Sequence, residues 1–174
     1  PICSISVVIP VFQEEANLSA LCEQVWPVRE GRALDVDGIF VDDGSTDGSF
    51  KILREIADTR AGVRVISFRR NAGQTAAMQA GIDAASHEVI VPLDADLQND
   101  PADIPRLLDK LNQGWDVVSG WRKQRSDAAV RRNLLSRMAN RMISKATGVA
   151  LHDYGCSLKA YRSSVVKGVR LYGD

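Results

Sequence analysis

Two carboxylates and an amide that follow a short apolar run near the middle of the chain could bind a hard metal ion. Asp94, Asp96 and Gln98 occupy alternate positions directly after the apolar residues 89–93. The β-branched residues of that run predict a buried parallel strand, and the polar residues predict the loop at its carboxyl end. Three oxygen donors in so short a span suit Mg²⁺ or Mn²⁺ that carries phosphate ligands. The alternative is a solvated acidic turn, because this pattern is common by chance.

A second pair of acids, Asp42 and Asp43, follows another predicted strand at 38–41. Gly44 permits a tight turn, and Ser45 or Thr46 followed by Asp47 can cap a helix predicted over 49–59. A capped turn explains residues 44–47 but does not explain two adjacent carboxylates. Their mutual repulsion favours a bound ligand or cation at this position.

The first predicted strand, residues 4–10, leads into an aromatic side chain and a run of polar residues. Phe12 could stack on a nucleobase or cap the hydrophobic core, and the sequence leaves both open. Apolar residues at helical spacing predict a helix over 17–28 that ends near Pro27.

The remaining elements alternate between strands and helices. Strands are predicted at 63–68, 89–91 and 116–120, and helices at 75–86 and 101–113. This alternation predicts an α/β fold with a mainly parallel sheet, right-handed crossovers and helices on both faces. Three strand ends would then carry acids at one edge of the sheet, which favours a ligand site there. A further strand is predicted at 157–161.

Two other segments, a turn and a basic stretch, could bind anions. Arg69, Arg70 and the amides around Gly73 could face a diphosphate, although an ordinary turn explains the same residues. Residues 121–148 hold eight bases and a single acid, which predicts a segment that binds an anion or lies on an anionic surface. Within a helix predicted over 128–147, Arg132 and Ser136 lie one turn apart and could both face a phosphate. A solvated basic face is the alternative for the outer bases.

Composition limits the class of protein. The 174 residues carry no net charge, yet residues 1–120 hold 19 acids and 10 bases, whereas residues 121–174 hold 3 acids and 12 bases. The chain contains no apolar run of membrane-spanning length, and its three cysteines do not suggest a disulfide framework or a zinc site. We therefore expect a single α/β domain in a reducing, cytoplasmic setting, and we expect the chain to be a fragment.

Six segments in this order resemble glycosyltransferase family 2: VVIPVFQEE, VDDGSTDGS, NAGQTAAMQAG, PLDADLQNDP, SGWRKQR and DYGCSLKAYR. Within that family the chain looks most like the polyprenyl-phosphate glycosyltransferases of the dolichyl-phosphate mannose synthase group. The resemblance implies a GT-A fold, Rossmann-like, in a single catalytic domain over 1–174. It also implies a nucleotide-sugar-binding half at 1–120 and an acceptor-binding half at 121–174, with a truncated C-terminus.

The resemblance also implies roles for individual residues. The nucleotide-sugar pocket would be lined by Pro10, Phe12, Glu14, Asp42, Asp43, Gln74 and Asp94. The bridging Mg²⁺ or Mn²⁺ would be held by Asp94, Asp96 and Gln98, and the acceptor phosphate by Arg122, Arg132 and Ser136. Asp96, Arg122 and Arg132 would be the catalytic residues. The chain departs from the family at Phe12 and Gln13, where Tyr and Asn are usual, so a tyrosine hydroxyl is missing from the pocket.

The implied reaction is an inverting, metal-dependent transfer of a sugar from a UDP- or GDP-linked donor to undecaprenyl or dolichyl phosphate. A phosphate acceptor is already anionic near neutral pH, so it needs arginines to hold it and no strong base. The resemblance places the domain on the cytoplasmic face of the membrane in cell-envelope synthesis, with no nucleic-acid partner, and leaves a homo-oligomer open. Two alternatives remain: a family 2 enzyme that glycosylates a sugar hydroxyl, and a silent nucleotide-sugar-binding module.

Overall fold

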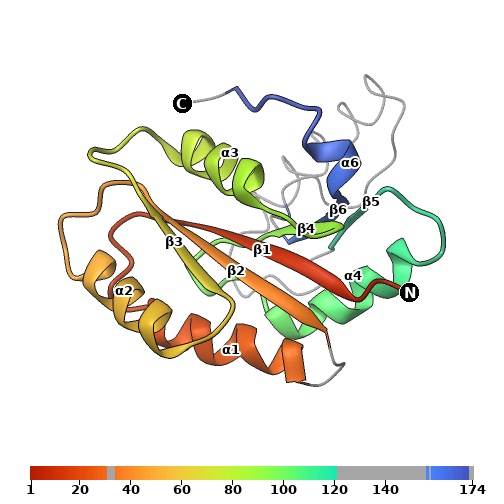
Figure 1. Cartoon of the computed structure of the whole chain (residues 1–174), viewed down its shortest axis with the longest axis horizontal. Coiled ribbons are helices and arrows are strands. Elements are labelled where there is room, and N and C mark those ends of the chain that lie inside the picture. The colour runs from red at the N-terminus through yellow and green to blue at the C-terminus, as the bar shows by residue number, and fades with distance from the viewer. Residues whose placement is uncertain (31–33, 121–155, 157, 173–174) are drawn as a thin grey trace, which may run out of the picture.

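A computed structural model describes residues 1–30, 34–120, 156 and 158–172 of the chain, as six strands and the helices between them (Figure 1). In chain order the elements are β1 (Ser4–Val11), α1 (Leu18–Glu30), β2 (Asp35–Asp42), α2 (Ser49–Thr59), β3 (Val63–Ser67), α3 (Gln74–Ala84), β4 (Val89–Pro92), the 3₁₀ turn η1 (Pro101–Asp103), α4 (Ile104–Leu111), β5 (Val117–Ser119), β6 (Lys159–Arg162) and α6 (Ser163–Val166).

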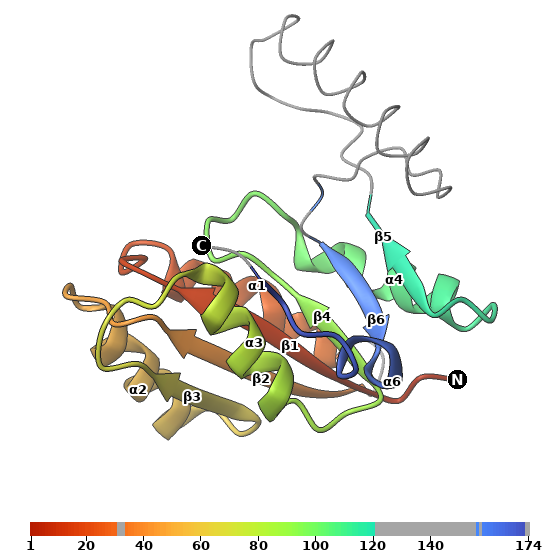
Figure 2. The same cartoon turned by 90° about the horizontal axis from the view of Figure 1, so that it is seen from above.

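The strands form one sheet in the order β3-β2-β1-β4-β6-β5. The pairs β1–β2, β1–β4 and β2–β3 are parallel, which confirms the predicted mainly parallel sheet. The strand predicted at 116–120 is β5, shortened to Val117–Ser119, and it does not pair directly with β4. Instead β6 lies between β4 and β5 and is antiparallel to both, as Figure 2 shows. A strand from the far end of the chain thus completes the sheet.

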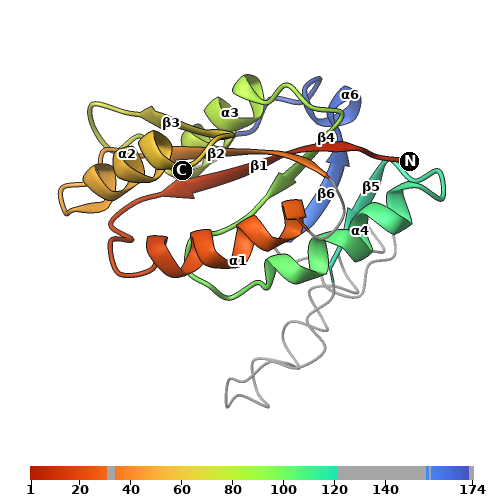
Figure 3. The same cartoon turned by 60° about the horizontal axis from the view of Figure 1, so that its bottom comes forward.

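Helices cover both faces of the sheet, as predicted. One core contains Ile5, Val7 and Ile9 of β1 together with apolar residues of α1, α2 and α4, and the other contains Val8 together with residues of α3 and α6. Figures 1 and 3 show α1 and α4 on one side of the sheet and α3 and α6 on the other. Alternate residues of β1 therefore face opposite layers, as the pleat of a strand requires.

The helix α3 lies unusually close to the sheet. A Cβ atom added to Gly81 would lie 2.2 Å from Val8 Cγ1 and 3.2 Å from Val41 Cγ2, so no side chain fits between the helix and the strands. Ala77, one turn earlier, is also fully buried. Small residues on this face of α3 therefore set its distance from β1 and β2.

Two boundaries differ from the prediction for physical reasons. The second strand begins at Asp35, not at residue 38, because Val36 is buried and the carboxylate of Asp37 is paired with Arg64. The first helix continues through Pro27 to Glu30, although a proline cannot donate the helical hydrogen bond, because Val28 is buried against the core.

The other predicted elements match to different extents. The helix predicted over 49–59 is α2 with the same bounds, whereas the one predicted over 101–113 is divided into η1 and the shorter α4. The strand predicted at 157–161 is β6, displaced to Lys159–Arg162. The helix predicted over 128–147 lies outside the described residues.

Candidate functional site

The predicted site lies where the strand order reverses. From β1 the chain proceeds through β2 to β3 on one side, and β4 lies on the other side of β1. In open α/β sheets, ligands bind outside the carboxyl ends of the strands at such a switch point. We call this end of β1, β2 and β4 the carboxyl edge. Because these strands are parallel neighbours, the predicted convergence of the acid-bearing loops at one edge is confirmed.

The carboxyl edge is stepped between β1 and β4. The last backbone hydrogen bond at the end of β4 runs from Leu93 N to Val8 O, at 2.9 Å. Beyond that point β1 continues to Val11, which pairs with Asp42 of β2. The loop that begins at Asp94 therefore leaves the sheet lower than the loops that follow β1 and β2.

In the loop after β4, polar and apolar side chains alternate. Asp96 and Gln98 are exposed and Asp94 is half-buried, whereas Ala95 is buried and Leu97 packs against the core. Leu97 has a left-handed backbone with φ of 61°, a conformation that a side chain of its kind seldom adopts. Such strained positions cluster at ligand sites. The alternation anchors the loop and leaves its oxygen donors exposed.

Each carboxylate of this loop is held by one hydrogen bond. Gln74 Nε2, at the start of α3, donates to Asp94 Oδ1 at 3.1 Å, and the backbone N–H of Gln98 donates to Asp96 Oδ1 at 3.1 Å. Within the described residues, Oδ2 of Asp94 and of Asp96 accepts no hydrogen bond, and no basic side chain lies within ion-pair distance of either. Two oriented carboxylates that have no cationic partner among the described residues fit a divalent ion.

The donor set is oxygen only, as Mg²⁺ and Mn²⁺ prefer. Among the described residues, no group of three or more His, Cys, Asp or Glu side chains is placed to hold a metal ion. The predicted set differs, since it combines the carboxylates of Asp94 and Asp96 with the amide of Gln98. A metal held by these three residues stays a prediction.

Asp42 and Asp43 are both buried, with 2% of each exposed. Asp42 accepts hydrogen bonds from Ser45 N at 3.1 Å and from Ser67 Oγ at 2.9 Å. These bonds, from the turn and from the neighbouring strand, engage both of its oxygens. Protein donors alone therefore account for the burial of the Asp42 carboxylate.

Asp43 accepts hydrogen bonds from Ala72 N at 2.7 Å and from Gly73 N at 3.0 Å. The expectation that the amides around Gly73 face a diphosphate is therefore wrong for these two amides. They bind the carboxylate of Asp43 at the beginning of α3, where the helix dipole also favours a negative charge.

The three predicted pocket residues at the end of β1 differ in exposure. Pro10 is buried within β1, and Glu14 is half-buried with its Oε2 accepting a hydrogen bond from Asn17 Nδ2 at 2.6 Å. Phe12 is 43% exposed and belongs to neither core. Of the two interpretations of Phe12, capping the core is wrong, and an exposed ring at the carboxyl edge remains.

Two loops at this edge are joined by hydrogen bonds that the sequence analysis missed. Gln13 N donates to Ser45 Oγ and Glu14 N donates to Ser49 Oγ, each at 3.0 Å. Gln13 has a left-handed backbone with φ of 56°. A helix cap was the only role expected for Ser45, because nothing local in the sequence relates it to Gln13.

The join is reciprocal. Gly48 N donates to Glu15 Oε2 at 2.8 Å, and a Cβ atom on Gly48 would lie 2.5 Å from Glu15 Oε1. Glu15 N donates in return to Asp47 Oδ2 at 3.4 Å, and Ser49 N donates to Asp47 Oδ1 at 3.0 Å. Desolvation is the largest single influence and opposes the charged form of Asp47, but the hydrogen bonds from Ser49 and from the backbone of Glu15 and Asp47 together outweigh it and lower the pKa of this carboxyl. We call residues 12–17 and 45–49 the paired loops.

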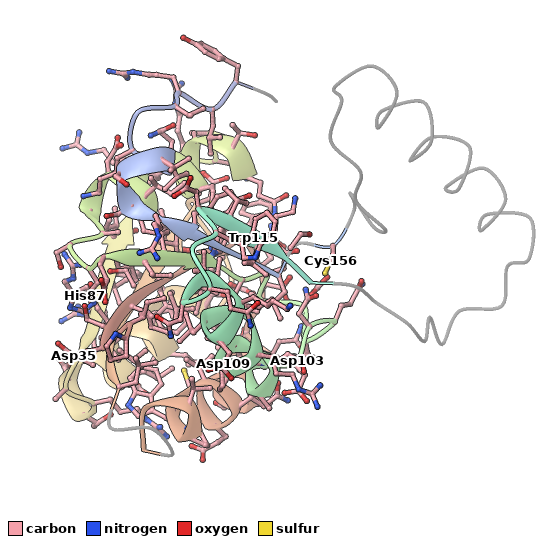
Figure 4. The ribbon with its side chains drawn as sticks, turned by 90° about the vertical axis from the view of Figure 1, so that its right-hand side faces the viewer. Asp35, His87, Asp103, Asp109, Trp115 and Cys156 are labelled. Carbon is pink, nitrogen blue, oxygen red and sulfur yellow. The ribbon has the colours of Figure 1, made fainter. Side chains whose placement is uncertain are left out.

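The opposite end of the sheet, which we call the amino edge, also carries charged side chains. Asp37 accepts hydrogen bonds from Arg64 Nε at 3.0 Å, from Arg64 Nη2, and from Ser6 Oγ at 3.4 Å. The hydrogen bond with Asp37 raises the pKa of Arg64. Asp35 Oδ2 lies 3.4 Å from His87 Nε2, and Figure 4 shows these two side chains next to each other. At this edge the charges are paired within the protein.

Three predicted residues, Arg122, Arg132 and Ser136, lie outside the described residues. The predicted acceptor-phosphate site and the two predicted catalytic arginines therefore stay predictions. In the described part of the chain, no helix combines the length and the apolar character needed to cross a bilayer.

A family model described as Glycosyl transferase family 2 matches residues 6–170. Over 172 residues the chain is 44% identical to the dodecaprenyl-phosphate galacturonate synthase of Rhizobium johnstonii, covering 98% of this chain and 51% of that protein. Over 173 residues it is 44% identical to the undecaprenyl-phosphate 4-deoxy-4-formamido-L-arabinose transferase of Pseudomonas aeruginosa, covering 97% and 50%. The chain thus spans about half the length of the curated relatives it matches.

Solved structures of similar fold include glucosyl-3-phosphoglycerate synthase from Mycobacterium tuberculosis. In complex with Mn²⁺, uridine diphosphate and glucosyl-3-phosphoglycerate, that protein superposes with a TM-score of 0.67 at 26% identity. The superposition covers 95% of this chain and 59% of the synthase.

Proposed function

The chain belongs to glycosyl transferase family 2 and has the GT-A fold, and from this premise we propose that it transfers a sugar from a nucleotide sugar to a polyprenyl phosphate. The relatives named for transfer to dodecaprenyl and undecaprenyl phosphate support the acceptor class. The synthase structure that contains uridine diphosphate and Mn²⁺ supports a nucleoside diphosphate donor and a divalent metal.

One observation carries the donor half of this proposal: the arrangement of Asp94 and Asp96 at the switch point. Each carboxylate is held by one protein hydrogen bond, and within the described residues neither has a basic partner. Two oriented acids without a counter-charge repel each other and any diphosphate, unless a cation lies between them and the ligand. The site is therefore suited to a metal-bound diphosphate.

On the donor side, each residue of the site would have a separate role in binding. The exposed ring of Phe12 would stack on the nucleobase, with Pro10 and Glu14 beside it and Asp42 and Asp43 behind it. Asp94, Asp96 and Gln98 would hold the metal, and Gln74 would orient Asp94. Bound there, Mg²⁺ or Mn²⁺ would supply positive charge that stabilises the departing diphosphate.

On the acceptor side, Arg122, Arg132 and Ser136 would hold the lipid phosphate on the opposite face of the sugar. A phosphate oxygen would attack the anomeric carbon in line as the bond to the nucleoside diphosphate breaks, which inverts the configuration at that carbon. The acceptor is already ionised, so the arginines would position it and neutralise its charge.

This division makes residues 1–120 the donor half and residues 121–174 the acceptor half of a single catalytic domain. The lopsided charge supports it, since the first part holds 19 acids against 10 bases and the second part 3 against 12. The substrate would place the domain at the cytoplasmic face of a membrane, in the synthesis of cell-envelope glycolipids.

Transfer to a lipid phosphate tests the proposal. The chain would be incubated with radiolabelled UDP- or GDP-sugars, undecaprenyl phosphate in detergent and Mn²⁺, and the organic phase would be counted. We expect labelled lipid only with the metal and only from one nucleotide class, and none after chelation with EDTA. Asp83→Ala, at an exposed acid on the far end of α3, is the matched control and should transfer normally.

Two other outcomes of this assay would lead to a different assignment of the function. Label that appears on an added sugar acceptor, and not on the lipid, would identify a family member that glycosylates hydroxyl groups. Binding of nucleotide without transfer to either acceptor would indicate a silent nucleotide-sugar-binding module.

A further inference from the structure

We propose that Ser45 and Asp42 are positioning residues that hold the ring of Phe12 in place for the nucleobase by acting through the backbone of Gln13. The inference rests on the proposed function, because it assumes that Phe12 stacks on the donor. It adds a role for the turn after β2, which the sequence analysis assigned to capping a helix and to contacts with the nucleotide.

The backbone next to Phe12 is strained at Gln13. Gln13 and Leu97 are the two non-glycine residues with positive φ in the described part of the chain, and each directly follows a predicted donor-site residue. A left-handed residue changes the direction of the chain abruptly, and a glutamine adopts it only where its surroundings enforce it. Phe12 lies between this turn and the buried end of β1, so the conformation of Gln13 constrains the backbone on the carboxyl side of the ring.

Ser45 enforces that conformation. Gln13 N donates a hydrogen bond to Ser45 Oγ at 3.0 Å, which joins the strained residue to the neighbouring loop. Ser45 is itself fixed, because its backbone N–H donates to the buried carboxylate of Asp42 at 3.1 Å. The other oxygen of Asp42 accepts from Ser67 Oγ on β3, at 2.9 Å.

These bonds form one continuous series from the end of β3, through β2, to the end of β1. Asp42 and Ser67 are paired residues of β2 and β3, and Ser45 and Gln13 lie on the loops that follow β2 and β1, whose last residues Asp42 and Val11 are also paired. The remaining bonds of the paired loops, from Glu14 N to Ser49 Oγ and from Gly48 N to Glu15 Oε2, keep the two loops in register. A hydroxyl at position 45 is therefore the point at which the sheet fixes the aromatic platform.

A double-mutant cycle tests the proposal. Ser45→Val removes the hydroxyl, Ser45→Thr keeps it with a side chain of the same shape as Val, and Phe12→Leu removes the ring. Calorimetry would measure the Kd of UDP and of GDP with Mn²⁺ for each variant and for the double variant Phe12→Leu/Ser45→Val. The matched control is Thr46→Val, because the adjacent Thr46 is exposed and makes no hydrogen bond within the described residues.

We expect Ser45→Val to raise the Kd of the preferred nucleotide about three- to tenfold, the loss that one hydrogen bond accounts for. Ser45→Thr should restore the affinity, and Thr46→Val should leave it unchanged. In the Phe12→Leu background the effect of Ser45→Val should shrink below about twofold, because the hydroxyl acts through the ring. A purely structural role would weaken binding equally in both backgrounds. Amide exchange at Gln13 should accelerate in Ser45→Val but not in Ser45→Thr.

The outcomes separate this inference from the function on which it rests. If the wild-type chain binds neither UDP nor GDP, the proposed donor site is wrong, and this inference fails with it. If the wild type binds a nucleotide and Ser45→Val binds it equally well, only the positioning role is overturned. The same holds if Ser45→Val loses the same factor with and without the ring of Phe12.

Discussion

Acids lie at both ends of the sheet, but their charges are compensated differently. At the amino edge, Asp37 is bound by Arg64 and Ser6, and Asp35 lies beside His87. At the carboxyl edge, within the described residues, no basic side chain lies within ion-pair distance of Asp94 or Asp96. Acidic composition therefore does not identify the site. The way in which each charge is compensated within the described residues is what distinguishes the two edges.

Compensation at the amino edge comes from the protein and contributes to stability. Among the described residues, compensation at the carboxyl edge is incomplete, and under the proposed function a bound ligand would complete it and gain affinity from it. If this contrast is correct, substitutions at the two edges should affect different measurements: denaturation at one and ligand affinity at the other.

The largest effect is expected from Asp96→Ala at the carboxyl edge. Loss of a proposed metal ligand should weaken metal-dependent nucleotide binding by more than about a hundredfold, since even residues that only support ligands cost tenfold or more. The exposed side chain makes few contacts, so the free energy of unfolding should change by less than about 0.5 kcal/mol. Calorimetry with Mn²⁺ and urea denaturation would measure both, and unchanged affinity would remove the proposed contrast.

The converse substitution is Asp37→Ala at the amino edge. It leaves the half-exposed Arg64 without its partner and should lower the free energy of unfolding by about 2 kcal/mol, while nucleotide affinity stays the same. The double variant Asp37→Leu/Arg64→Leu should recover most of the loss, because it leaves no unpaired charge. Urea denaturation of the three proteins is the measurement, and a loss of nucleotide affinity in a well-folded Asp37→Ala would contradict the division.

A smaller effect is expected from Gln74→Leu, which removes the hydrogen bond to Asp94 Oδ1. A carboxylate that supports a metal but has lost its orienting partner should bind Mn²⁺ about tenfold more weakly in the presence of nucleotide. Gln79→Leu, further along the same helix, is the control, because its amide bonds Asp83 and not the site. Equal Mn²⁺ affinity in both variants would show that Gln74 does not orient the ligand.

The smallest effect concerns the paired loops at low pH. The pKa of Asp47 is lowered below its ordinary 3.8 in the folded chain, so the bonds that it accepts are present above that pH and are lost as the pH falls through the lower folded value. Amide exchange at Ser49 and Glu15, corrected for its intrinsic pH dependence, should therefore increase in that acid window. Asp47→Asn should abolish this pH dependence, and an identical profile in the variant would exclude Asp47 as its source.

Local patterns in the sequence predicted those features that depend on neighbouring residues. The helix α2 has the predicted bounds, since its turn, its cap and its apolar spacing are all contiguous. The strand β2 starts earlier than predicted. In the sequence Asp37 is typical of a loop, whereas in the structure its carboxylate is hydrogen-bonded to Arg64 and is compatible with a strand. The antiparallel strand β6 could not be placed either, because strand order is fixed by packing across the whole sheet.

For the candidate site, too, the sequence predicted the residues with local signals and not the contacts between distant loops. Asp94, Asp96 and Phe12 stood out by residue type and by their place at the ends of strands, and the structure puts them at one edge of the sheet. The role of Ser45 did not stand out. Its partner Gln13 lies on a different loop, and a serine in a turn has an adequate local explanation as a cap.

The close approach of α3 to the sheet at Gly81 has a consequence for how this chain can vary. A single methyl group there would meet Val8 and push the helix outward, and the same helix carries Gln74 at its other end. Position 81 should therefore reject every side chain in any homologue that keeps this spacing, although it touches no substrate. An invariant glycine at that position would reflect the short distance between α3 and the sheet, and it would not indicate a catalytic role.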